Sequence, residues 1–193
     1  RDIRFEMTQV NVPAYIEQSG KSSQVAAREL RYRFFAEMMN KHPFHYLALA
    51  HHGDDQIETI LMRLTRGSSG KARAGIPLIR PFVNGEIIRP FLCLIKEELE
   101  SYCRIYQLEP RIDPSNEQDV YSRNRFRKYV LPFLKQENPQ VHEHFQRYSE
   151  ELENDERYLF ELTKQKMNKV MEEGKGKVTL HISLFLELPK PLQ

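Results

Sequence analysis

The chain has 193 residues, of which 40% are hydrophobic and 29% charged, and its formal net charge is +2. That is enough for one domain with its own core, or for one domain and part of another. The composition excludes a disordered chain, and no apolar run approaches the roughly 20 residues that a membrane-spanning helix needs. The two cysteines, Cys93 and Cys103, are too few for a disulfide framework or a metal cage, and they indicate a reduced, cytoplasmic protein.

The small net charge conceals blocks of opposite sign along the sequence. Residues 60–92 carry six basic residues against one acidic residue, and residues 123–148 carry six against two. Residues 93–122 carry three basic residues against seven acidic ones, and residues 149–173 carry four against eight. The basic blocks suit a polyanionic partner such as a nucleotide or RNA, but ordinary solvent-exposed faces explain them equally well.

Helix and strand patterns alternate in the first third of the chain. A polar break at residues 19–23 precedes a predicted helix over residues 25–39. The apolar run Tyr46–Ala50 predicts a central strand that is buried on both faces. After it, the spacing of four apolar residues predicts an amphipathic helix: Ile57, Ile60, Leu61 and Leu64. The fold class predicted from this alternation is α/β.

The middle of the chain predicts a hairpin followed by a helix. The phrase Ile-Arg-Pro-Phe occurs at residues 79–82 and again at residues 88–91, on either side of Asn84-Gly85. Asn-Gly tolerates positive φ and therefore predicts a two-residue turn. A helical stripe that includes Tyr102 and Cys103 predicts that the Cys103 thiol faces a core.

The last third is predicted to be mostly helical. Turn residues at Asp113–Asn116 precede a helix around Phe126, and Pro139 opens a helical stretch that reaches about residue 173. Residues 178–182 alternate as a strand. We expect a domain boundary near residues 136–150, where the long helical stretch begins.

The strongest candidate site follows the predicted central strand, where open α/β sheets bind their ligands. It contains two imidazoles and three carboxylates: His51, His52, Asp54, Asp55 and Glu58. These groups could hold a divalent cation, or orient ATP through magnesium. A capping box with Asp55 as N-cap and Glu58 three residues later explains two of the carboxylates without any ligand, but it leaves the other three residues unexplained.

A second candidate is the basic run from Arg123 to Lys128. Arg123 and Arg127 are one helical turn apart, so their guanidiniums could together clamp a phosphate or a carboxylate. Arg28 and Arg31 have a similar spacing on the earlier helix. A solvated basic face explains both pairs as well.

Two lysine-containing loops fail the requirements of a nucleotide-binding P-loop. Gly67–Ala72 has the wrong glycine spacing, and Ser19–Ser22 has Tyr15 where the first glycine must be. The loop at residues 66–75 fits a mobile basic loop that contacts RNA or phosphates. Its basic residues are Arg66, Lys71 and Arg73.

Five motifs, taken in order, resemble those of the tRNA(Ile)-lysidine synthetases. They are Ala50–Thr59 (AHHGDDQIET), Arg66-Gly67, Ile88–Leu92 (IRPFL), Asp113–Asn116 (DPSN) and Arg123–Arg127 (RNRFR). Ala27-Arg28 followed by Arg31-Tyr32 matches the helix that precedes the family's His-Asp motif. The resemblance is specific from about Arg28 to Pro139 and looser to the end of the chain.

The resemblance implies a fold and a domain organisation. Residues 1–138 would form a Rossmann-like, N-type ATP pyrophosphatase domain (the adenine nucleotide alpha hydrolase-like fold), with a parallel sheet and helices, whose first strand and phosphate loop are missing. Residues 139–193 would form a helical linker and the start of a second, mostly helical and incomplete domain that binds tRNA.

The resemblance also implies a reaction. Family members use ATP and Mg²⁺ to adenylate the C2 oxygen of the wobble cytidine in an isoleucine tRNA with a CAU anticodon, and the amine of L-lysine then displaces AMP from C2 to give lysidine. The enzyme would be cytoplasmic, away from membranes, and the sequence is compatible with a homodimer.

Residue roles follow from the same resemblance. Asp55, Glu58 and Arg127 would be catalytic, the two acids as ligands of the lysine ammonium or of the activation site, and Arg127 stabilising phosphate charge as AMP leaves. The resemblance assigns nucleotide or lysine binding to Arg28, Arg31, His51, His52, Asp54, Arg123 and Asn124. It assigns tRNA binding to Arg66, Lys71, Arg73, Arg125 and Lys128, and it assigns no residue as a metal ligand.

One family motif, the Ser-Gly-Gly-x-Asp-Ser loop that wraps the pyrophosphate, is absent from the sequence. We expect it upstream of Arg1, and we expect the 193-residue chain alone not to form lysidine. Two alternatives stay open: another ATP pyrophosphatase, such as a tRNA thiolase or an amidotransferase-linked synthetase, and a non-catalytic RNA-binding module. Cys93 and Cys103 lack the paired spacing of thiolases, which counts against a thiolase.

Overall fold

A computed structural model describes residues 3–111, 122–174 and 177–193. The chain divides into two compact units that are interleaved along the sequence. Unit 1 comprises residues 1–50 and 78–90, and unit 2 comprises residues 51–77 and 91–193. The turn predicted at Asp113–Asn116 lies outside the described residues, and the domain boundary after residue 138 stays a prediction.

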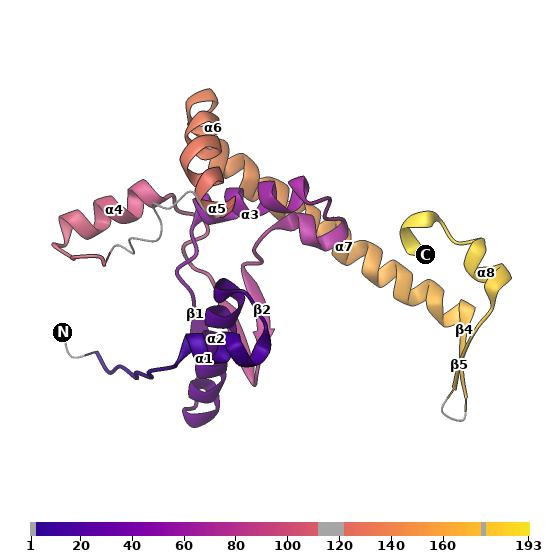
Figure 1. Ribbon diagram of the computed structural model, residues 1–193. Coiled ribbons are helices and arrows are strands. Elements are labelled where there is room, and N and C mark those ends of the chain that lie inside the picture. The colour runs from indigo at the N-terminus through magenta and orange to yellow at the C-terminus, as the bar shows by residue number, and fades with distance from the viewer. Residues whose placement is uncertain (1–2, 112–121, 175–176) are drawn as a thin grey trace. The chain divides into compact units, whose positions relative to one another are not determined.

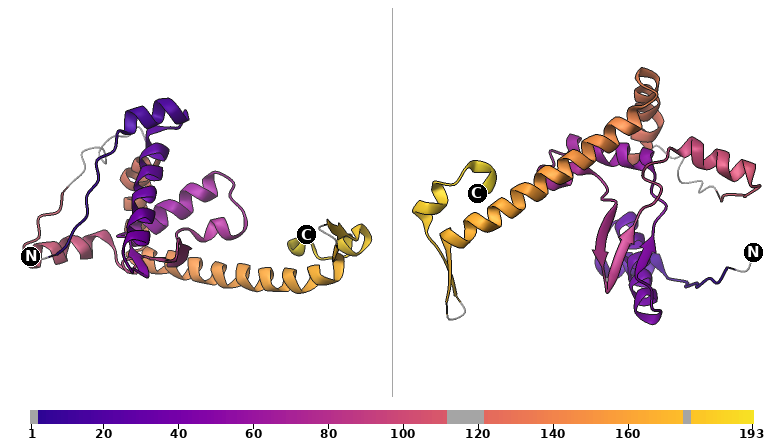
Figure 2. Two further views of the ribbon diagram at one scale, coloured as in Figure 1. Left: turned by 90° about the horizontal axis from the view of Figure 1, so that it is seen from below. Right: turned by 180° about the vertical axis from the view of Figure 1, so that it is seen from behind.

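Unit 1 is built on a three-stranded sheet in the order β1-β3-β2. β1 (Tyr46–Ala48) pairs in parallel with β3 (Gly85–Ile88), which pairs antiparallel with β2 (Ile79–Phe82). The unit also contains two helices, α1 (Val12–Ser19) and α2 (Ser23–Lys41), and α2 lies on one face of the sheet (Figure 1; Figure 2). The parallel strand pair and the flanking helices confirm the predicted α/β class.

The helix predicted over residues 25–39 is α2, which follows the polar break as expected. Gly20 ends α1 in a left-handed conformation, with φ of 65°, and its N–H donates to the carbonyl oxygen of Ile16. α2 buries Ala26, Leu30 and Met39. Met39 lies nine positions after Leu30, about half a turn around the helix axis from it, so the three buried residues do not share one face.

β1 differs from the central strand predicted from its apolar run. Among the described residues it is an edge strand, with Tyr46 62% exposed and Leu47 half-buried. The central strand of the described sheet is β3, which carries the fully buried Ile87. An apolar run shows that side chains avoid water, but it does not show how many strands pair with the segment.

The predicted hairpin is present, with its turn one residue earlier than expected. Phe82 pairs with Gly85, so the turn residues are Val83 and Asn84. Val83 has a left-handed φ of 53°, which is unfavourable for a β-branched residue. Gly85 serves close packing instead of the turn, because a Cβ at this position would overlap the carbonyl oxygen of His45.

Unit 2 is mostly helical and contains the long helix α7 (Val141–Val170) (Figure 1). The helix predicted after the first strand is α3 (Gly53–Thr65), which packs against α7 and against a short 3-10 helix, η1 (Gly70–Ala74). A small core joins Ile57 of α3 to residues of the C-terminal helices, namely Leu131 and Val141. This core holds the start of α3 in place.

The C-terminal end of unit 2 is a hairpin followed by a short helix. β4 (Met171–Gly174) pairs antiparallel with β5 (Lys177–Leu180), and α8 (Ile182–Leu186) comes next. The strand predicted over residues 178–182 therefore ends before Ile182. No helix in the described part of the chain has the length and apolar character to cross a membrane.

The helical stripe predicted before residue 106 belongs to α4 (Lys96–Ile105), which buries none of its residues. Tyr102 is 55% exposed, Tyr106 is 56% exposed and Cys103 is only half-buried. The core position predicted for Cys103 is therefore wrong. Periodicity predicted the helix correctly, but the described residues place no covering surface over its apolar stripe.

Replacing Gly85 with alanine tests the close approach between β3 and the chain before β1. We expect Gly85→Ala to lower the free energy of unfolding by about 1–3 kcal/mol, because the backbone must shift to accommodate the methyl group. Gly174→Ala is the matched control, since a Cβ there meets no atom within 4 Å. Equal urea midpoints for the two variants would contradict the packing role of Gly85.

Candidate active site

The predicted cluster of imidazoles and carboxylates forms the start of α3. The helix begins at Gly53 with His52 as N-cap, and the Asp55 carboxylate accepts the backbone N–H of His52 at 3.2 Å. The N-cap role predicted for Asp55 is therefore wrong, because Asp55 is the acid of the third helical position that reaches back to the cap. Glu58 lies one turn further on and takes no part in capping.

Glu58 is fully buried and is neutralised by two arginines. Arg123 Nε lies 2.9 Å from Oε2 of Glu58, and Arg127 donates from Nε to Oε1 at 2.6 Å and from Nη2 to Oε2 at 3.1 Å. Arg127 Nη2 also donates to Oδ1 of Asp55 at 3.1 Å. The result is an ion-pair cluster of two carboxylates and two guanidiniums.

The two arginines come from consecutive helical segments. Arg123 lies in α5 (Ser122–Arg125), and Arg127 lies in a π-helical turn, η3 (Phe126–Val130), that leads into α6 (Leu131–Glu137). Their spacing predicted that both guanidiniums would act on one anion. In the structure that anion is a carboxylate of the same chain.

The charges of the cluster stabilise one another. Burial alone would lower the pKa of the Arg127 guanidinium, but hydrogen bonds to Glu58 and the attraction of Glu58, Asp55 and Asp54 raise it above its ordinary value. Arg123 also donates from Nη2 to the Thr59 hydroxyl at 3.0 Å. The cluster is thus held by hydrogen bonds as well as by charge.

Lys135 of α6 belongs to the same region and was missed by the sequence reasoning. Its ammonium lies 2.9 Å from Oδ2 of Asp54 and 2.9 Å from both carboxylate oxygens of Glu97. Burial would lower the pKa of Lys135, but its two carboxylate partners raise it. The only signal in the sequence was the basic character of residues 123–148, which does not show which acid each cation meets.

Two polar atoms at the start of α3 are buried without a hydrogen-bond partner among the described residues. They are Nδ1 of His52 and Oδ1 of Asp54. His52 Nε2 lies 3.5 Å from Asp55, and His51 is half-buried just before the helix. Buried polar atoms in native proteins are almost always satisfied by protein groups, ordered water or a ligand, so these two atoms can bind water or a ligand at this end of α3.

The described residues do not form a metal site on their own. No group of three or more His, Cys, Asp and Glu side chains within them is placed to hold an ion. The carboxylates of Asp54, Asp55 and Glu58 are bound by lysine and arginine instead. A magnesium ion held by protein groups alone does not fit this arrangement.

The remaining predicted residues lie outside the cluster. Asn124 is buried in α5, and Arg125 and Lys128 are exposed, with Lys128 Nζ 5.2 Å from the centre of the Tyr129 ring. Arg28 and Arg31 are exposed residues of α2 and therefore belong to unit 1.

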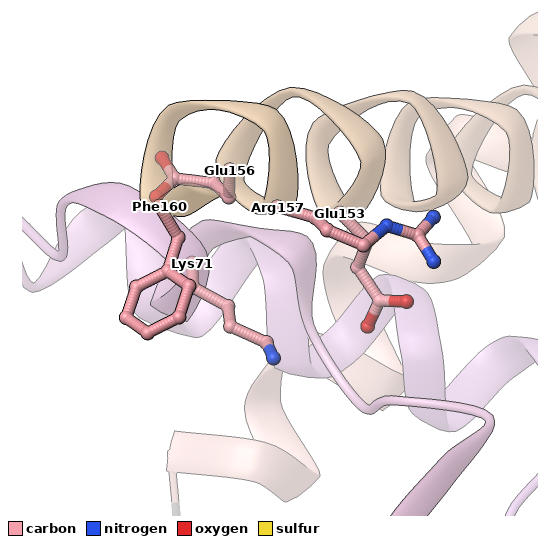
Figure 3. A pocket seen from close by; sticks show the side chains of 5 residues that line it. All are labelled: Lys71, Glu153, Glu156, Arg157 and Phe160. Atoms are coloured by element: carbon pink, nitrogen blue, oxygen red, sulfur yellow. The ribbon is translucent and has the colours of Figure 1, made fainter. Parts of the chain in front are cut away.

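The basic loop at residues 66–75 contacts α7. Arg66 is exposed directly after α3, and Arg73 lies 3.7 Å from Glu156. Lys71 lines a cavity of about 450 Å³ between η1 and α7 (Figure 3). The other lining residues are Glu153, Glu156, Arg157 and Phe160. Acidic residues of α7 therefore face the basic residues of this loop.

The buried side chain of Gln56 holds the end of this loop. Its Oε1 accepts the N–H of Ile76 at 2.6 Å, and its Nε2 lies 3.1 Å from the Ile76 carbonyl and 2.9 Å from the Ser149 hydroxyl on α7. Gly75, with φ of 81°, is required beside it, because a Cβ there would be 2.6 Å from Gln56 Oε1. No pattern in the sequence indicated this anchor.

Glu58→Gln tests the ion-pair cluster. We expect the free energy of unfolding to fall by about 2–3 kcal/mol, because two guanidiniums lose their buried counter-charge. The loss is below that of a fully buried pair, since the Arg123 and Arg127 side chains are 41% and 29% exposed. Glu97→Gln, at a side chain that is 60% exposed, should stay within about 0.5 kcal/mol. Equal losses in chemical denaturation would show that the cluster does not stabilise unit 2.

Gln56→Leu tests the loop anchor. We expect a loss of about 2–4 kcal/mol and faster tryptic cleavage within residues 66–75, because the Ile76 N–H stays buried without an acceptor. Gln146→Leu, which removes an exposed hydrogen bond to Glu150, is the matched control. If both variants show the wild-type cleavage rate, Gln56 does not hold the loop.

Comparison with known proteins gives the family of the chain. A family model described as the PP-loop domain matches residues 2–134. The chain is 55% identical, over all of its 193 residues, to the tRNA(Ile)-lysidine synthase of Geobacillus kaustophilus, of which it covers 42%. Proteins of the same name from Bacillus anthracis and Bacillus subtilis are 54% and 53% identical, with 97% of this chain and 40% of each relative covered. The chain thus spans about two fifths of the length of these curated relatives, and it belongs to the PP-loop domain family.

Proposed function

We propose that this chain is part of an ATP-dependent ligase that joins L-lysine to C2 of the wobble cytidine of an isoleucine tRNA with a CAU anticodon. The tRNA is first adenylated with release of diphosphate, and the lysine amine then displaces AMP to give lysidine. The observation that carries this proposal is the 55% identity, over the whole chain, to a protein named tRNA(Ile)-lysidine synthase. The reaction takes place in the cytoplasm, and the proposal holds equally for a monomer and for the homodimer that the sequence allows.

We propose that residues 1–138 form a catalytic domain with the Rossmann-like ATP pyrophosphatase fold. Residues 139–193 would form the start of a tRNA-binding domain. The parallel pairing of β1 with β3 supports this assignment, as does the match of the PP-loop model to residues 2–134. ATP is the source of the adenylate. We assign no protein ligand to Mg²⁺, which would accompany the ATP phosphates.

The ion-pair cluster supports distinct roles for its members. Asp55 lies in the first turn of α3 and is 14% exposed, and we assign it to binding the lysine ammonium. Glu58 is fully buried, so we assign it to holding the arginine forks in position. Arg127 then stabilises the negative charge that develops on the phosphate as AMP leaves, with Arg123 beside it.

Groups around the cluster complete the proposed site. The unsatisfied Nδ1 of His52 and Oδ1 of Asp54 are available to the nucleotide or to lysine. We assign nucleotide or lysine binding also to His51 and Asn124 of unit 2 and, independently of this cluster, to Arg31 of unit 1. Contacts to tRNA phosphates are assigned to basic residues of the loop and of the helices, namely Arg66, Lys71, Arg73, Arg125 and Lys128.

Asp55→Asn in the full-length protein tests the catalytic proposal. We expect AMP release with isoleucine tRNA to depend on lysine in the wild type and to fall at least about 100-fold in the variant, since the amide removes the charge that receives the ammonium. Binding of tRNA, followed by its salt dependence, should be nearly unchanged.

The matched control is Asp155→Asn, at an exposed position of α7, which should keep wild-type turnover. AMP release without lysine dependence would contradict the ligase proposal. Binding of tRNA without any AMP release would indicate a non-catalytic RNA-binding module. If Asp55→Asn abolished binding together with turnover, the role assigned to Asp55 would be wrong.

A further inference from the structure

A group of arginines and aromatic rings lies in unit 1, where α2 meets the hairpin. The guanidinium of Arg28 lies 4.6 Å from the centre of the Tyr32 ring and donates to the Tyr32 hydroxyl at 3.1 Å. The guanidinium of Arg80 lies 5.5 Å from the Tyr32 ring and 5.7 Å from the Phe82 ring. The two rings meet edge to face, with centres 5.7 Å apart. Stacking of this kind fixes the planes of both guanidiniums.

The positive charge of this group is not cancelled in the way seen elsewhere in the chain. Among the described residues, neither Arg28 nor Arg80 forms an ion pair with a carboxylate. Arg33 also forms no ion pair in the described residues, but it lies near a carboxylate. Its guanidinium is 5.3 Å from the Tyr15 ring, and the pKa of the Glu29 carboxyl is lowered by hydrogen bonds from Lys21 and Tyr15 and, to a smaller extent, by the charge of Arg33. In the described residues, arginines therefore stack on two tyrosines: Tyr15, which lies beside a carboxylate, and Tyr32, which does not.

The positive charges of this group shift the pKa values of Tyr32 and Arg89. Burial would raise the pKa of Tyr32, but a hydrogen bond from Arg80 and the charges of Arg28, Arg80 and Arg89 lower it below its ordinary value. Arg89 is 3% exposed, and burial lowers its pKa. The interaction with Tyr32 opposes this effect, whereas repulsion from Arg80 and Arg28 adds to it. Positive potential of three guanidiniums is thus concentrated around one phenol.

We propose that Arg28, Arg80 and Tyr32 bind a phosphate group of an RNA backbone. Two guanidiniums of fixed orientation and a phenolic O–H are donors suited to the oxygens of one phosphodiester. Arg28 is exposed, so the site is open to a large ligand. The assignment to RNA rests on the proposed tRNA substrate, and the phosphates of ATP share the same chemistry.

Arg80→Gln in the full-length protein tests this site, with a transcript of isoleucine tRNA (CAU anticodon) as the probe. We expect roughly 3- to 10-fold weaker binding at low salt, and a slope of log K against log [salt] that is smaller by about 0.7–0.9, the value of one lost phosphate contact. Arg33→Gln, which removes the same charge from the other stack, should bind within about two-fold of wild type. Equal losses in both variants, or none in Arg80→Gln, would overturn the proposal.

Further measurements distinguish an RNA phosphate contact from a folding defect and from ATP binding. Arg80→Lys keeps the positive charge, so the slope of log K against log [salt] should return to nearly the wild-type value. If the weaker binding of Arg80→Gln came from a damaged fold, Arg80→Lys would bind as weakly. In turnover, Arg80→Gln should raise KM for tRNA and leave kcat at saturating tRNA unchanged. A fall in ATP affinity with unchanged tRNA affinity would assign the site to the nucleotide and overturn the RNA assignment.

The outcomes also distinguish this proposal from the proposed function. Salt-dependent tRNA binding that needs Arg80, without lysine-dependent AMP release, would support the phosphate site and contradict the ligase. If AMP release depends on lysine but Arg80→Gln leaves tRNA affinity unchanged, the result would support the ligase and contradict the phosphate site.

Discussion

The buried carboxylate of Glu58 is the constraint on which the organisation of unit 2 depends. An ionised group removed from water without a partner costs several kcal/mol, so the chain must bring cations to it. Arg123 and Arg127, which are 65 and 69 positions away in sequence, meet this need. Their ion pairs join α5 and the π-helical turn to α3, and Lys135 joins α6 to the same helix through Asp54. Three segments are thereby fixed around the first turns of α3.

This arrangement links stability to the proposed chemistry. The guanidinium of Arg127 is oriented by three hydrogen bonds to carboxylates, so it does not have to be ordered when a ligand arrives. Such preorganised charge is what stabilises a developing negative charge in a transition state. The same bonds also hold the fold, so a substitution at Glu58 acts on both. Asp55, which is more accessible, offers the cleaner separation between them.

Local patterns in the sequence predicted the elements, while distant contacts decided their surroundings. α2, α3 and the hairpin follow from periodicity and turn residues, because these are properties of adjacent positions. The partner of Arg123 could not be predicted from a spacing of one helical turn, since Glu58 lies far away in sequence. The hairpin turn shifted by one residue because Gly85 is required for its approach to His45, which the pair Asn84-Gly85 does not reveal. The edge position of β1 likewise depends on strand pairing and not on its own composition.

Charge counted along the sequence gives a misleading picture of where an anion would bind. Residues 123–148 have a strong excess of basic residues, yet Arg123, Arg127 and Lys135 are already paired with carboxylates. Arg80 belongs to the basic block of residues 60–92 and Arg28 to a separate segment, so a linear count does not show that they meet. They meet over the ring of Tyr32 and form no ion pair with a carboxylate in the described residues. A cation that is already paired contributes little field at a distance from its pair, so long-range attraction of a polyanion depends on unneutralised charge and not on the number of basic residues. A paired guanidinium such as that of Arg127 acts instead on a group that it touches directly.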